Sequence, residues 1–90
     1  MAKVRNTVTV RDLLFYAVHA HRKAYNGALP RYFMLHPSVV AQLMVLPESR
    51  YEIALKADGS LVLWNGIQIN ESPKHKYSSY CCEDGKIEFL

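Results

Sequence analysis

The side chains that could hold a metal ion are four histidines and two cysteines: His19, His21, His36, His75, Cys81 and Cys82. None of them stands in a C-x-x-C or H-x-x-x-H arrangement, the spacings that bring two ligands to one ion. His19 and His21 are two residues apart, about 200° around a helix, so they cannot chelate the same ion. We interpret His21 as a hydrogen-bonded histidine at the edge of the core, and we expect neither a metal nor a cofactor.

The sequence contains no motif for nucleophilic catalysis either. A G-x-S-x-G elbow is absent, and the four glycines are too scattered to form a phosphate-binding loop. A pair between either cysteine and His75 or His36 stays open, because such partners meet in space rather than in sequence. Three acidic residues cluster around one turn, which is typical of a solvated hairpin tip: Glu83, Asp84 and Glu88. We therefore expect a protein that is not an enzyme and has no small-molecule substrate.

The cysteines are adjacent, and this favours reduced thiols. Neighbouring side chains of a strand point to opposite faces, so a bond between Cys81 and Cys82 requires a distorted peptide. We expect one thiol to be buried and the other less so. Reduced cysteines, and an N-terminal stretch in which Lys3 and Arg5 precede polar residues, indicate a cytoplasmic protein without a signal peptide. The apolar stretches are about half as long as the ~20 residues that a membrane span needs, so no membrane partner is expected.

Charge is distributed unevenly along the 90 residues. Residues 1–36 carry six basic side chains and one acidic side chain, a net charge of +5, whereas residues 37–90 carry five basic and seven acidic ones, a net charge of −2. This polarity fits contact with an acidic protein surface, including the opposite end of an identical chain, and it fits an ordinary solvated basic face equally well. The alternative is a small nucleic-acid-binding module that uses the basic N-terminal part.

Aromatic residues of the second half are the other candidates for contact, because tyrosine and tryptophan often anchor interfaces. A single tryptophan in a chain of this size is also a common core residue. The predicted binding residues are Arg11, Arg22, Lys23, Trp64, Tyr77 and Tyr80.

These residues need elements that position them, and the first is an amphipathic helix over residues 10–25. Its apolar stripe recurs at helical spacing: Val10, Leu13, Leu14, Ala17, Val18, His21, Ala24 and Tyr25. Phe15 and Tyr16 widen that face. Thr9 with Asp12 predicts a capping box, and Asn26-Gly27 predicts the end of the helix.

Shorter elements follow. Residues 31–35 form a buried strand, and Pro37 then begins a helix that Pro47 ends near residue 46. From Tyr51 the apolar period changes to two, which predicts a strand over 51–56. Residues 61–70 are either a hairpin turning at Asn65-Gly66 or one long strand bulged at Gly66, and the short length of the flanking strands favours the bulge. Residues 77–82 and 86–89 form a hairpin. We predict one α+β domain over 1–90, with both helices packed on a mostly antiparallel sheet.

A strand, a helix that begins with His-Pro and a later apolar stretch follow one another between residues 31 and 73. The residues that carry this pattern are Phe33-Met34-Leu35-His36-Pro37, Leu43, Gly59, Leu63-Trp64, Gly66-Ile67 and Ile69. The pattern resembles a segment of tailed-phage major capsid proteins and is similar in character to small phage and prophage proteins, although Asn65 interrupts it and Gln68 replaces the usual proline. The resemblance implies a phage or mobile-element accessory protein that binds protein or self-assembles in the host cytoplasm, and it implies no catalytic residue.

Overall fold

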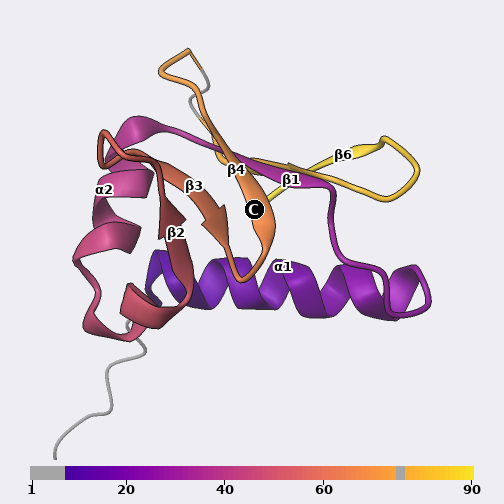
Figure 1. Ribbon diagram of the computed structural model, residues 1–90. Helices are drawn as coiled ribbons and strands as arrows, with labels where there is room; N and C mark the ends of the chain where they lie inside the picture. Colours follow the sequence, from indigo (N-terminus) through magenta and orange to yellow (C-terminus); the bar gives the residue numbers. More distant parts are fainter. Residues whose placement is uncertain (1–7, 75–76) are drawn as a thin grey trace, which may run out of the picture.

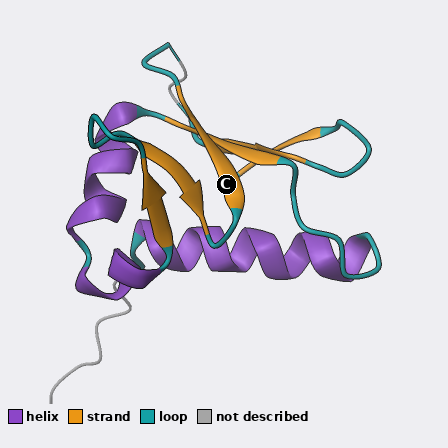
Figure 2. Ribbon diagram, in the orientation of Figure 1, coloured by secondary structure: helices purple, strands orange, loops and turns teal. Residues whose placement is uncertain are grey.

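Two α-helices and a short 3-10 helix pack against one face of a six-stranded sheet (Figure 1 and Figure 2). The computed structural model describes residues 8–74 and 77–90. The elements, in chain order, are α1 (Val10–Ala24), β1 (Tyr32–Leu35), α2 (Pro37–Val45), the 3-10 helix η1 (Pro47–Tyr51), β2 (Ile53–Leu55), β3 (Leu61–Trp64), β4 (Ile67–Glu71), β5 (Ser79–Cys81) and β6 (Ile87–Phe89). This arrangement confirms the α+β prediction.

Helix α1 begins at the predicted residue and ends one residue before the predicted end. The Thr9 side chain accepts a hydrogen bond from the Asp12 N–H, and the Asp12 carboxylate accepts one from the Thr9 N–H, which completes the capping box. Asn26 and Gly27 adopt the left-handed conformation, with φ of 56° and 87°. The Gly27 N–H then donates to the Arg22 carbonyl oxygen at 2.7 Å, satisfying a carbonyl of the last turn.

Strand β1 is central in the sheet, whose order is β2-β3-β4-β1-β5-β6. It pairs in parallel with β4 and antiparallel with β5, and every other pairing is antiparallel. Phe33 and Leu35 are fully buried, because they point from this central strand toward the helices.

The core lies between the helices and the sheet. Leu14 of α1 and Leu43 of α2 are both fully buried and belong to the same apolar cluster as Phe33 of β1 and Trp64 of β3. On this surface of the sheet, edge-to-face aromatic contacts join Trp64 to Phe33 and to Phe15 of α1. Burial of the indole follows from this position.

Between β1 and β2, helix α2 is formed as predicted, but the 3-10 helix η1 that follows it was not predicted. His36 caps α2, since its Nδ1 accepts a hydrogen bond from the Ser38 N–H, and Pro37 occupies the first turn as expected. Pro47 follows the end of α2 but also begins η1, because its fixed φ suits the first position of a 3-10 turn as well. The strand predicted over 51–56 is therefore reduced to Ile53–Leu55.

Residues 61–70 form a hairpin, so the preference for a bulged strand is wrong. Asn65 and Gly66 both have positive φ, 49° and 80°, and Trp64 stands opposite Ile67. Two consecutive left-handed residues give the two-residue turn whose twist matches that of paired strands. The flanking strands have four and five residues, which is an ordinary length in sheets.

The last two strands form the predicted hairpin, and both cysteines stand directly before its turn. Cys81 and Cys82 are free thiols, 5% and 2% exposed. The expectation that one would be less buried is wrong. Cys81 belongs to β5 and Cys82 directly follows it, where its N–H donates to the Lys86 carbonyl oxygen at 2.7 Å.

Candidate protein-binding surface

The N-terminal end of α1 is held to the β2 and β3 strands by one carboxylate, that of Glu52. Arg11 Nε donates to Glu52 Oε1 at 2.9 Å, and Arg11 Nη2 donates to Oε2 at 2.6 Å. Trp64 Nε1 donates to the same Oε1 at 3.2 Å. The hydrogen bonds from Arg11 lower the pKa of Glu52 despite the opposing effect of burial.

This cluster contains two residues of the predicted binding set, Arg11 and Trp64. Arg11 is neutralised within the chain, and its guanidinium also lies over the Phe15 ring, 4.8 Å from the centroid. Trp64 is 1% exposed, so a partner cannot reach it. The prediction of Trp64 as an accessible contact residue is therefore wrong, whereas that of Arg11, whose side chain is 27% exposed, stays a prediction.

The C-terminal end of α1 is held to the β5–β6 hairpin through His21, which is 2% exposed. Its Nδ1–H donates to the Ala28 carbonyl oxygen at 2.8 Å, and its Nε2 accepts from the Glu83 N–H at 2.9 Å. These two backbone partners select the neutral tautomer with the proton on Nδ1. His21 is thus the hydrogen-bonded core histidine that the sequence indicated, and Tyr25 stacks on it while donating to Asp84.

Several of the described groups that chemistry would need are engaged or buried. Burial raises the pKa of Cys82, which disfavours the thiolate that nucleophilic attack requires. His36 is occupied as the cap of α2, and His75 lies outside the described residues. Asp84 accepts from the Lys86 N–H, which lowers its pKa and identifies it as a turn residue. Within residues 8–74 and 77–90, no three metal-binding side chains come together.

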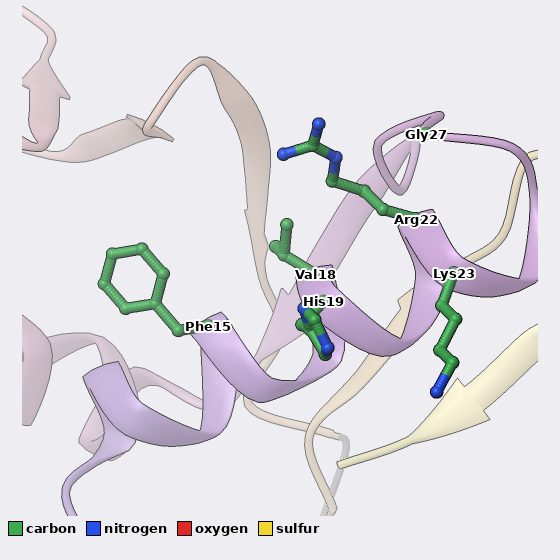
Figure 3. A pocket seen from close by; sticks show the side chains of 6 residues that line it. All are labelled: Phe15, Val18, His19, Arg22, Lys23 and Gly27. Carbon is green, nitrogen blue, oxygen red and sulfur yellow. The ribbon is translucent and has the colours of Figure 1, made fainter.

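The remaining basic candidates, Arg22 and Lys23, are exposed but do not converge. Figure 3 shows their side chains leaving α1 in different directions, as adjacent helical residues must. The depression of about 710 Å³ beside them is lined by α1 residues and by Gly27 alone, so it is the flank of a helix and not a cleft between elements.

The other flank of α1 meets the sheet in an apolar groove of about 300 Å³, called here the α1–β6 groove. Its lining residues are all uncharged: Leu13, Tyr16, Ala17, Ala20, Tyr80, Phe89 and Leu90. Tyr16, 76% exposed, stands at its rim, whereas the 70% exposed Phe89 pairs with Ser79 and so directs its side chain to the face of the sheet opposite Tyr80 and α1. Of the predicted contact residues, Tyr80 lines the groove, whereas the exposed Tyr77 packs edge-to-face against Phe89 outside it.

Part of this groove could have been predicted from the sequence. Leu13 belongs to the apolar stripe of α1 and Tyr16 stands beside it, yet both are exposed, because the sheet covers only the side of α1 that carries Leu14 and Ala17. An apolar stripe wider than the buried face is the signal for a free apolar flank. No sequence pattern predicts that Phe89 borders the groove, because this depends on the position of β6 in the sheet.

No protein-family model matches the chain, no curated protein matches it in sequence, and no solved structure matches its fold. Among the helices of the described residues, none has the length and apolar character that crossing a membrane requires.

Proposed function

We propose that this domain is a non-enzymatic protein-binding module that associates with a second copy of itself through the α1–β6 groove. The observation that supports this most directly is the exposure of Leu13 and Tyr16 along an uncharged groove. Apolar side chains gathered on a surface gain free energy when another apolar surface removes them from water. A phage or mobile-element accessory role is part of the proposal on the resemblance of residues 31–73 alone.

The rigidity of α1 supports the same function. The Arg11–Glu52 ion pair holds one end of the helix, and the hydrogen bond between His21 and Glu83 holds the other. A surface whose backbone is already ordered loses little conformational entropy on association. The groove therefore presents its rims in a fixed geometry.

The test compares two exposed tyrosines on different parts of the surface. Tyr16 is at the groove, whereas Tyr51 of η1 is 91% exposed and contributes nothing to the groove. Sedimentation equilibrium over a wide range of protein concentrations should show association of the unmodified chain. Tyr16→Gln should weaken it on the order of tenfold, the effect of losing one aromatic anchor, and Tyr51→Gln should leave it unchanged. A chain that stays monomeric throughout, or equal effects of the two substitutions, would contradict the proposal.

The alternative function, nucleic-acid binding, rests on the exposure of Arg22, Lys23 and Arg31, none of which forms an ion pair within the described part of the chain. It predicts an affinity for a mixed-sequence oligonucleotide that falls as salt rises. Charge reversal of Arg22 and Lys23 together should abolish that binding while leaving self-association intact. A gel shift that stays flat at low salt would eliminate this function.

A further inference from the structure

Within residues 8–74 and 77–90 the sheet has two edges that no further strand covers, and they are not equivalent. Strand β2 forms one edge, and its register with β3 shifts between Ala54 and Leu55, an irregularity that interrupts the row of backbone groups. Strand β6 forms the other edge and pairs with β5 in unbroken register (Figure 1). The β6 edge is therefore the regular one.

The hydrogen-bonding pattern shows which backbone groups of β6 are free to pair. The Cys82 N–H donates to the Lys86 carbonyl oxygen, and the Leu90 N–H donates to that of Ser78. Because bonded and non-bonded positions alternate in an antiparallel pair, residues 86, 88 and 90 face β5. The N–H and C=O groups of Ile87 and Phe89 consequently point away from β5, toward the open edge.

Three antiparallel registers would allow β6 to pair with β6 of a second copy through these groups. With the two-fold axis at Glu88, the two Glu88 carboxylates stand opposite each other, which is unfavourable. With the axis at Phe89, Glu88 stands opposite Leu90. With the axis at Ile87, Lys86 of each copy stands opposite Glu88 of the other copy. Only this last register places opposite charges across the axis.

Side chains at these positions suit that register. Lys86 and Glu88 lie on one face of β6 and already pair within the strand at 3.2 Å, and both are exposed enough to reach a neighbour, at 66% and 43% of the side chain. Ile87, 48% exposed, lies on the opposite face and would meet its own counterpart. In an antiparallel pair the positions flanking a bonded pair bring side chains closest, so Lys86 and Glu88 would stand at the closer separation.

We propose that two copies of this chain join β6 to β6 in antiparallel fashion, centred on Ile87, to form one continuous sheet in which Lys86 of each copy pairs with Glu88 of the other. This inference rests on the proposed function and specifies its geometry. A two-fold axis perpendicular to the sheet keeps both α1 helices on the same face, so the two α1–β6 grooves flank the joint and Tyr16 of each copy faces the other copy's helix.

The experiment separates charge pairing between copies from charge pairing within one strand. Glu88→Lys gives a strand with two lysines, and Lys86→Glu gives a strand with two carboxylates. Each variant alone places like charges across the axis. A one-to-one mixture restores opposite charges across the axis without changing either strand internally. Sedimentation at low ionic strength, where exposed charges are least screened, measures association of each variant and of the mixture.

We expect the unmodified chain to dimerise, each single variant to associate about tenfold more weakly, and the mixture and the double variant Lys86→Glu/Glu88→Lys to recover the original affinity. Ile87→Pro, which removes the N–H at the axis without touching a bond to β5, should abolish dimerisation while the circular dichroism spectrum stays unchanged. Tyr51→Gln serves as the control.

The possible failures are distinguishable. A chain that dimerises, loses affinity with Tyr16→Gln and is indifferent to the β6 variants would overturn the β6 pairing while leaving the proposed function intact. A mixture that associates no better than either variant alone would also overturn the pairing. A chain that is monomeric at every concentration would overturn both proposals.

Discussion

A single carboxylate, Glu52, links three elements that are distant in sequence. It accepts hydrogen bonds from Arg11 in α1 and from Trp64 in β3, while its own backbone carbonyl oxygen accepts from the Asn65 N–H at 2.6 Å. The charge of Glu52 is therefore part of how α1 docks on the sheet. Such a group makes stability depend on pH in a predictable direction.

The first prediction concerns that dependence. Because the pKa of Glu52 is lower in the folded state than in the unfolded state, its stabilisation is present above the ordinary glutamate pKa and is lost as pH falls through the lowered value. Glu52→Gln should lower the urea midpoint at neutral pH, and the difference from the unmodified chain should shrink in acid. Urea titrations of both proteins across this pH range measure it. A difference that is constant with pH would show that the carboxylate charge is not involved.

The second prediction concerns His21, whose two ring nitrogens both bond to backbone groups in a nearly water-free site. His21→Ala should leave the Glu83 N–H and the Ala28 carbonyl oxygen without their partner, and should cost about 2–4 kcal/mol of unfolding free energy. Chemical denaturation measures the loss. His19→Ala, at an exposed position of the same helix, is the matched control and should change stability little.

At the scale of elements, the β3–β4 hairpin depends on two residues with positive φ. Nothing lies within 4 Å of a Cβ added at Gly66, so the effect of adding one there is purely conformational. Gly66→Ala should therefore destabilise the fold by about 1–2 kcal/mol, the cost of a left-handed conformation for a residue with a Cβ. Asn65→Gly, which keeps the left-handed conformation accessible, should change stability by less than that. Equal losses in thermal denaturation of the two variants would contradict the assignment of the turn.

Elements whose ends are set by residues close in sequence could be predicted from short motifs. The Thr9–Asp12 box and the Asn26-Gly27 stop defined α1 within one residue, since caps are made by side chains close in sequence. The hairpin at Asn65-Gly66 was also visible, and the preference for a bulge failed because four-residue strands suffice when a third strand supports them.

Long-range pairing was not predictable in the same way. Arg11 and Glu52 are 41 residues apart, and nothing near either residue in sequence indicates that they meet. Consequently the sequence suggested a free arginine at a position that is neutralised, and an accessible tryptophan at a position that is buried. Tyr77 and Tyr80 were predicted as contact residues only because aromatic residues often anchor interfaces, and of the two Tyr80 lines the candidate groove.

At the scale of the whole molecule, the buried thiols report on opening of the β5–β6 region. Cys81 and Cys82 are almost inaccessible in the folded chain, and burial raises the pKa of Cys82. Alkylation by iodoacetamide should therefore be slow in native conditions and should accelerate with urea in parallel with opening of this region. Mass spectrometry of timed samples measures this rate. Rapid labelling of the native chain would contradict the packing and reopen the hypothesis of a cysteine nucleophile.

Strand β1 lies in the middle of the sheet but is made early in the chain, and both of its neighbours follow it by more than thirty residues. When a ribosome has released only the first half of the chain, β1 has no partner for either of its edges, and Phe33 and Leu35 have no sheet to share. The nascent chain then exposes the apolar side chains and unpaired backbone groups of β1 until β4 and β5 emerge. Burial of Phe33 and Leu35 within a paired sheet is in consequence possible only after β4 and β5 have been synthesised.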